Sequence, residues 1–515
     1  MMNFRKSYFF ALITVFSISG CVALFMLEGC NNNKLAYTPT GNIAVDGRNL
    51  VQINCTRCHA LVPVNALNKN VWKFHTLPAM SRYFGISTYM TGYYKGPKDT
   101  AGISLAEWQT IVSYYEKMAP DTLVNPAKPV PLINDRAGFA LKTPPPVKNP
   151  SFTTLAAIDP VTHDIFTSDG GTNKLTVRDN KFKIKSVTDL PSTAVNAFFD
   201  TTAKSVFLSC IGRLEPVDFP NGRVFEVGPG TRGAASKPML IASDLARPVQ
   251  TLEGDFNKDG LTDLVILAQG HLKGGVYLFK QNKDKSYSQS TITEQPGAVQ
   301  AITGDFNNDG WPDLMVLFGS GDEGLWLFLN DHKGGFTQKN LLRFPPVYGS
   351  TSFQLADIDH DGKPDLIYTC GYNFHDSRVL KPYHGLYIYK NEGNWNFKQQ
   401  WFYPINGCTK AIAADFDGDG DLDIATSAFF ADMKNEPAES FVYFEQVGPY
   451  NFKPHAIPIS KYGRWISMEV GDYNGDGKPD IILGNFSHGF LFQLGFKPFW
   501  DSYIPFVVLE NTFKK

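Results

Sequence analysis

The chain has 515 residues, of which 43% are hydrophobic and 14% aromatic, and this much apolar material predicts large cores in more than one domain. The formal net charge is −2 at pH 7. The sequence contains no basic run and no nucleic-acid-binding motif, so we expect no nucleic-acid partner.

The N-terminus has the pattern of an export signal, in which two basic residues precede a nearly uncharged apolar run at residues 8–27. Cys30, followed by three asparagines, resembles the lipidated cysteine of a bacterial lipoprotein. Cys21 matches the usual cleavage pattern better, but it would leave a very apolar mature start. An uncleaved anchor is a further alternative, since about 20 apolar residues can span a bilayer.

We therefore predict residues 1–30 as a lipoprotein-type signal or membrane anchor and residues 31–40 as a polar spacer. The protein is expected to be exported to the bacterial periplasm or the cell surface. It would be anchored to the membrane there through an N-terminal lipid or helix.

A cofactor signal follows the spacer, in the run Cys55-Thr56-Arg57-Cys58-His59. Two thiols three residues apart can reach both vinyl groups of one haem, and the adjacent histidine can supply the proximal iron ligand. A structural zinc site needs a second ligand pair, which is not nearby, and a redox disulfide has no need of the histidine. The motif predicts one covalent haem c.

Two helices are expected around this motif. Residues 44–54 lead into it, and Ser104 with Glu107 forms a capping box that starts a second helix. The second helix carries an apolar face made of Leu105, Trp108, Ile111, Val112 and Tyr115. Residues 41–120 resemble a small class I cytochrome c domain.

The distal iron ligand implied by this resemblance is Met80. The stretch from Trp72 to Met80 resembles the Trp…Leu-Pro-x-Met segment of short cytochrome domains fused to other modules. Met90 is the main competitor, and Met118 lies inside the expected second helix.

A proline-rich linker is predicted at residues 121–136. A short apolar strand and a loop precede each later repeat, and residues 139–147 have the same layout. A second domain should therefore span residues 137–515.

Five nine-residue acidic loops recur in this second domain. Each has a carboxylate or amide at positions 1, 3, 5 and 9 and glycine at position 6, and an apolar run follows. A hard divalent cation takes six to eight oxygens, position 7 can add its backbone carbonyl, and Ca²⁺ fits best. The alternative is a set of plain hairpin turns, where these residue types are also common. About five Ca²⁺ ions are predicted, with ligands at Asp255, Asn257, Asp259, Leu261 and Asp263; Asp305, Asn307, Asp309, Trp311 and Asp313; Asp357, Asp359, Asp361, Lys363 and Asp365; Asp415, Asp417, Asp419, Asp421 and Asp423; and Asp472, Asn474, Asp476, Lys478 and Asp480.

The repeated loop resembles the FG-GAP or VCBS repeat of integrin α-subunit propellers and many bacterial surface proteins. The first aspartates lie 50, 52, 58 and 57 residues apart, a length suited to one four-stranded propeller blade. Two degenerate copies, around Asp159 and Asp200, keep the apolar frame without the acidic ligands. The resemblance implies a seven-bladed β-propeller with cations on one face of the last five blades.

The ring is expected to close through its N-terminal strand. Residues 506–511 align with the third strand of earlier blades, so the last blade lacks an outer strand. Residues 138–143 are the spare copy, and their pairing there would cover an open sheet edge.

A propeller ligand is expected on the face opposite the cation loops, where polar loop residues gather. The candidates are Arg247, His271, Asp322, His375, Asp376, Lys410, Arg464, Trp465 and His488. Cys370 ends the second strand of one expected blade, and Cys408 enters the next blade, both near this face. We expect the two residues to form either a disulfide or a pair of buried free thiols.

The predicted fold class is multidomain, with a small all-α cytochrome c domain followed by an all-β propeller. The favoured function is an electron-transfer relay that uses a redox protein partner, with the propeller as a module that docks a protein or glycan. One alternative is a propeller oxidoreductase that passes substrate electrons to the haem, although no flavin or nicotinamide motif is present. The other is a surface adhesin with an ancillary haem.

Overall fold

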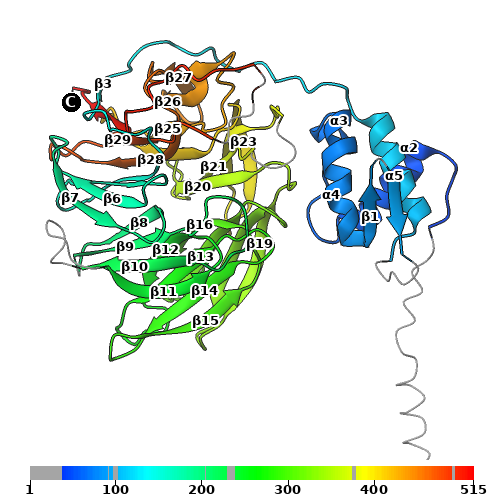
Figure 1. The fold of residues 1–515 in the computed structure, drawn as a ribbon, viewed down its shortest axis with the longest axis horizontal. Coiled ribbons are helices and arrows are strands. Elements are labelled where there is room, and N and C mark those ends of the chain that lie inside the picture. The colour runs from blue at the N-terminus through cyan, green and yellow to red at the C-terminus, as the bar shows by residue number, and fades with distance from the viewer. Residues whose placement is uncertain are drawn as a thin grey trace, which may run out of the picture.

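The computed structural model describes residues 37–90, 92–96, 102–202, 204–228, 238–373, 379–489, 493 and 495–514. Figure 1 shows a small helical unit beside a larger ring of β-sheets, with an extended segment running between them. The predicted signal at residues 1–30, with Cys21 and Cys30, lies outside the described residues. Within the described ranges, no helix has the length and apolar character needed to cross a membrane.

The helical unit precedes the ring and is built around two crossed helices. Its elements are α2 (Ile43–Cys55), η1 (Val64–Ala66), α3 (Lys69–Val71), the π-helical turn η2 (Trp72–Thr76), α4 (Leu77–Ser81), η3 (Arg82–Phe84), the hairpin β1 (Ile86–Tyr89) and β2 (Gly92–Lys95), and α5 (Leu105–Met118). Asn42 caps α2, and the Ser104–Glu107 capping box that starts α5 is confirmed. Gly47 allows the close crossing of α2 and α5, because a Cβ there would lie 2.2 Å from Tyr114 Cβ.

The core of this unit comes from the apolar face predicted for α5. Trp108, Ile111 and Tyr115 are buried together with Leu50 of α2 and Leu67. The helices at residues 44–54 and after Ser104 are thus present. The identification of the unit as a cytochrome c domain stays a prediction.

The ring consists of seven four-stranded antiparallel sheets, and the predicted seven-bladed all-β propeller is confirmed. Blade one has β4 (Thr153–Ile158), β5 (Ile165–Asp169), β6 (Lys174–Arg178) and β7 (Ile184–Asp189); blade two has β8 (Ala194–Asp200), β9 (Ser205–Cys210), β10 (Gly222–Val227) and β11 (Met239–Leu245); blade three has β12 (Pro248–Gly254), β13 (Asp263–Ala268), β14 (Gly275–Gln281) and β15 (Tyr287–Thr293). Blade four has β16 (Ala298–Gly304), β17 (Asp313–Phe318), β18 (Gly324–Asn330) and β19 (Phe336–Arg343); blade five has β20 (Ser350–Ala356), β21 (Asp365–Cys370), β22 (Gly385–Asn391) and β23 (Phe397–Pro404). Blade six has β24 (Lys410–Ala414), β25 (Asp423–Ser427), β26 (Phe441–Gln446) and β27 (Phe452–Ala456), with η4 (Pro437–Ser440) before β26; blade seven has β28 (Trp465–Gly471), β29 (Asp480–Asn485) and β30 (Phe506–Asn511).

The fourth strand of blade seven is β3 (Phe139–Lys142), which confirms the predicted ring closure. β3 pairs antiparallel with β30, with Phe139 opposite Asn511 and Lys142 opposite Val508. The Phe139 side chain is 2% exposed and packs in the core between blades six and seven. The two ends of the propeller therefore share one sheet.

Burial along each blade follows the position of the strand. The second strands, such as β13 and β17, are buried at every residue, because neighbouring blades cover both faces. β19, an outermost strand, is exposed or partly exposed at every residue. This explains why each acidic loop is followed by a continuous apolar run.

Glutamines on three inner strands join consecutive blades. Gln250 accepts from Ala301 N at 2.7 Å and donates to Ala301 O at 3.1 Å. Gln300 makes the same pair of bonds with Phe353, and Gln354 makes it with Ala413. Each amide thus adds two hydrogen bonds that cross from one sheet to the next.

The predicted linker contacts the propeller over part of its length. Lys128 Nζ lies 2.5 Å from Glu439 Oε1, and Ile133 forms a β-bridge with His455 next to blade six. The helical unit touches blade five, where Tyr383 Oη donates to Ala66 O at 3.2 Å.

Candidate functional site

The five acidic loops share one backbone conformation. In every loop the N–H of the position 6 glycine donates to Oδ2 of the position 1 aspartate, at 2.8–3.2 Å. The position 7 N–H donates to Oδ1 of the position 5 aspartate in the same way. The position 6 glycines have φ between +80° and +99°, a region that side chains with a Cβ rarely occupy. The conserved register of the repeat therefore has a direct conformational cause.

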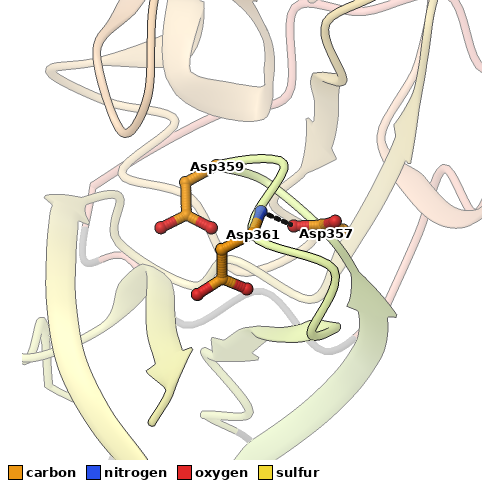
Figure 2. Close-up of side chains that lie close together, drawn as sticks. All are labelled: Asp357, Asp359 and Asp361. Carbon is orange, nitrogen blue, oxygen red and sulfur yellow. Dashed lines mark hydrogen bonds between the residues drawn. The ribbon is translucent and has the colours of Figure 1, made fainter.

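The side chains at positions 1, 3 and 5 gather on one side of the loop. Ligand atoms of Asp357, Asp359 and Asp361 all lie within 4.8 Å of one another, as do those of Asp415, Asp417 and Asp419. Figure 2 shows the first of these groups, with the Asp361 N–H donating to Asp357. The other three loops carry asparagine at position 3, which adds a neutral oxygen to two carboxylates. This donor set is the oxygen-rich one that Ca²⁺ prefers, so the residues fit the predicted ion.

The position 9 aspartates have a second role that the repeat pattern did not reveal. All five are 0% exposed. One oxygen of each accepts the N–H of the last residue of the third strand at 2.7–2.9 Å, at Gln281, Asn330, Asn391, Gln446 and Asn511. In four loops the other oxygen accepts the position 2 N–H. Position 9 thus fastens the cation loop to its blade.

Burial perturbs these carboxyl groups. Burial raises the pKa of Asp423 to about 7 and that of Asp480 to about 7, and it also raises the pKa values of Asp263, Asp313 and Asp365. The charges of nearby loop aspartates add to the shift. A divalent cation in the loop would offset this repulsion and favour the ionised form.

A lysine contacts one of the acidic loops, and this contact was not predicted from the sequence. Lys390, on β22, contacts both Asp359 and Asp361, with Nζ 3.2 Å from Asp361 Oδ2. These contacts raise the pKa of Lys390. In the sequence, Lys390 can be recognised as the basic residue directly before the last residue of the third strand. Blade three has Lys280 at the matching position.

The Cys55–His59 motif lies at the end of α2 and just after it. Both thiols are free, and Cys55 is half-buried while Cys58 is exposed. His59 Nδ1 lies 2.7 Å from Ala60 O, and donation to that carbonyl leaves Nε2 as the nitrogen available for a metal. Burial raises the pKa of Cys55 to about 11, whereas a redox-active pair needs a lowered thiol pKa.

The three candidate methionines differ sharply in environment. Met80, in α4, packs against the core of the helical unit. Met90 is 87% exposed, and Met118 is 43% exposed at the end of α5.

The face opposite the cation loops contains a cavity of about 290 Å³. Of the candidates predicted there, Arg247 and His271 line the cavity, together with Gln269, Tyr372 and Thr409. His488 is exposed, and Asp322 pairs with Arg343. Arg464 and Trp465 are 0% exposed, so they are not surface residues. Lys410 is partly exposed, and His375 and Asp376 lie outside the described residues.

Two further features of this region concern buried groups. Cys370 and Cys408 are buried free thiols, which agrees with the second of the two alternatives for this pair. Glu323 is 0% exposed and accepts from Gly349 N and from Ser350 N and Oγ. Burial raises the pKa of Glu323 to about 8.

The fold and the loops together define a β-propeller with acidic loops in five of its blades. The model of the FG-GAP-like repeat matches residues 255–316, 305–368 and 379–426, which contain four of the five loops. These segments are FG-GAP-like repeats, and the propeller that carries them is a binding module.

No curated protein matches the chain in sequence. Solved structures that resemble it include BBS1N in complex with ARL6DN soaked with lead, at 10% identity and a TM-score of 0.39, covering 70% of this chain and 95% of that one. The same complex soaked with mercury gives 10% identity and a TM-score of 0.40, covering 71% and 97%. These scores carry no argument about function.

Proposed function

We propose that the chain is an exported, membrane-tethered c-type cytochrome that relays electrons to or from a redox protein, with the FG-GAP propeller as its calcium-binding docking module. The observation that carries the proposal is the Cys55–Cys58–His59 motif, with both thiols free and His59 Nδ1 held by a carbonyl. A haem c bound there would supply one-electron chemistry.

The residues of the helical unit fit such a group. Cys55 and Cys58 would hold it covalently, and His59 and Met80 would supply ligands to its iron. Trp108 Nε1 is buried without a hydrogen-bond partner among the described residues, as expected beside an acceptor that the polypeptide does not supply. Several large apolar side chains of the unit are also exposed, including Ile53, Leu61 and Phe74. A prosthetic group would give them a partner.

With His59 and Met80 both bound to its iron, such a haem would supply one-electron transfer. No position would remain for oxygen or a substrate, so the chain would serve electron transfer and not substrate activation. The polypeptide would bury one edge of the haem and leave another edge accessible to the redox partner.

The docking role is supported by two loops on the face opposite the cation loops. Asp218 Oδ1 accepts the N–H groups of His271, Leu272 and Lys273, which ties the β9–β10 loop to the β13–β14 loop. Phe219 is 57% exposed and Leu272 is 60% exposed on this joined surface. An apolar surface held in place before binding suits a protein or a glycan partner, because little ordering is needed on association.

A propeller oxidoreductase is the second candidate, and the 290 Å³ cavity favours it. Arg247 and His271 could orient an anionic or hydroxylated substrate there. The two candidate functions differ in what reduces the haem. A protein reduces it in the electron-transfer relay, and a small molecule reduces it in the propeller oxidoreductase.

The test is an absorbance study of the purified full-length protein. A haem c spectrum is expected, and Cys58→Ala should lose one thioether bond. Met80→Ala should abolish the weak near-infrared sulfur-to-iron band of the oxidised form, while the matched variant Met90→Ala should retain it. Absence of covalent haem would overturn the proposal, and reduction by one member of a sugar and alcohol panel would favour the oxidoreductase.

A further inference from the structure

Arg464 is a buried cation that has no ion-pair partner among the described residues. Its side chain is 0% exposed, and none of its three guanidinium nitrogens has a hydrogen-bond partner in the described part of the chain. Burial lowers the pKa of Arg464 to about 9. A guanidinium remains protonated at neutral pH even so, and an uncompensated charge in the interior is strongly unfavourable.

The surroundings hold this guanidinium in one place. Arg464 N donates to Asn485 Oδ1 at 2.9 Å, and Arg464 O accepts from Phe486 N at 2.9 Å. The guanidinium carbon lies 3.8 Å from the centre of the Phe429 ring and 5.9 Å from that of Trp500. Aromatic rings attract the cation but cannot accept its five N–H bonds, which point outward from the edge of the group.

The other arginine that is buried in the described part of the propeller, Arg178, has a hydrogen-bond partner for its guanidinium. Arg178 is 7% exposed and also lies over an aromatic ring, that of Phe506 at 5.5 Å. Its Nη1, however, donates to Thr167 Oγ1 at 2.9 Å. The contrast shows that aromatic stacking alone does not complete such a site.

Arg464 directly precedes β28, at the end of blade seven opposite its cation loop. Ile466 and Thr409 line the 290 Å³ cavity, and Thr409 Oγ1 accepts from Phe429 N at 3.2 Å. Phe429 thus contacts both Arg464 and Thr409, a residue that lines the cavity. Movement of the segment around Phe429 would give a small solute a way in from the cavity.

We propose that Arg464 is the centre of an anion site that takes a small monovalent anion, either a halide or a carboxylate of one or two carbons. The anion accepts the N–H donors at the edge of the guanidinium, beside the Phe429 and Trp500 rings. Because Arg464 is 0% exposed, the proposed ligand is a small anion, and its occupancy does not depend on the haem or on the cation loops.

The test measures thermal stability of the full-length protein in calcium, at constant ionic strength. Gluconate, which is too large to enter, is replaced stepwise by chloride or by formate. The expected result is a saturable rise in Tm, on the order of 3 °C at a large excess over Kd. Arg464→Met should abolish this rise, whereas the matched variant Arg178→Met should keep it.

The two anions distinguish the source of the ligand, because a response to formate alone identifies a carboxylate and a response to chloride identifies a halide. A wild-type Tm that is the same in all three salts, or a response that survives in Arg464→Met, overturns the proposal. Native crystals grown in bromide provide an independent measurement if the variant does not fold. An anomalous peak in bromide, or density for formate in crystals grown in formate, within hydrogen-bond distance of Arg464 supports the site, and only water or no density there in both salts overturns it.

Discussion

The two roles of the acidic loop can be separated by two substitutions in blade six. Asp423, at position 9, is buried and accepts from Gln446 N at 2.8 Å, Tyr443 Oη at 2.7 Å and Phe416 N at 3.2 Å. In Asp423→Asn an NH₂ group replaces one of the two carboxylate oxygens. This NH₂ group then faces at least one of the three groups that donate to Asp423 in the wild type. A buried donor left without a partner costs about 1–3 kcal/mol, so we expect a loss of about 2 kcal/mol even in chelator.

Asp419→Asn is the matched control in the same loop. Asp419 is exposed, and its Oδ1 accepts only the Asp421 N–H among the hydrogen bonds of the described residues. An asparagine oxygen can keep that bond, so the free energy of unfolding in chelator should change by less than about 0.5 kcal/mol. In calcium both variants should lose part of the stabilisation that the ion gives the wild type, because each removes a predicted ligand.

The assay is urea unfolding of the full-length protein at 25 °C and pH 8, with calcium or with chelator, followed by far-ultraviolet circular dichroism. The reasoning is refuted if Asp423→Asn unfolds like the wild type in chelator, or if the two variants are equally damaging there. An unchanged calcium response in Asp419→Asn would contradict its role as a ligand.

Four further outcomes are expected. Chelation of calcium should lower the Tm of the propeller markedly and leave the haem spectrum unchanged; equal melting with and without chelator would remove the case for metal loops. Gln300→Ala should cost about 1–3 kcal/mol in urea unfolding because it leaves a backbone N–H and C=O of Phe353 unpaired, whereas Gln338→Ala, exposed on β19, should be nearly neutral. Phe139→Ala should cost about 3–5 kcal/mol, and a stability equal to that of the wild type would mean that β3 does not close the ring. The pKa of Glu323 in the folded chain, about 8, is above its unfolded value, so the folded state holds the proton more tightly and stability falls as pH rises from 5 to 8. Glu323→Gln should have a smaller slope in that window, and parallel pH profiles would show that the group does not titrate there.

The architecture of the propeller could be predicted from the sequence because each repeat is defined by residues that lie close together in the chain. The spacing of the first aspartates predicted the length and order of the blades. The glycine at position 6 of each loop indicated a residue with a left-handed backbone conformation. The missing outer strand was also predictable, since residues 506–511 matched a third strand and not a fourth.

Contacts between blades were not predictable in the same way. Gln250 and Ala301 are 51 residues apart, and nothing in either local sequence indicates their pairing. Arg464 was assigned to a polar surface loop, yet it is fully buried, because residues far along the chain, such as Phe429 and Trp500, cover it. Similarly, the buried role of the position 9 aspartates depends on a strand about 20 residues later.

The pairing of β3 with β30 has a consequence for the order of events during synthesis. Phe139 leaves the ribosome long before Asn511, its partner in the register. At the usual rate of translation, the first strand waits roughly 20–70 s for the strand that will cover it. The segments of blades one to six emerge in turn during that time, but the ring cannot close before the final strand is available. A nascent chain therefore exposes an apolar edge until its final blade is made, and for that interval β3 is the segment on which a chaperone would act.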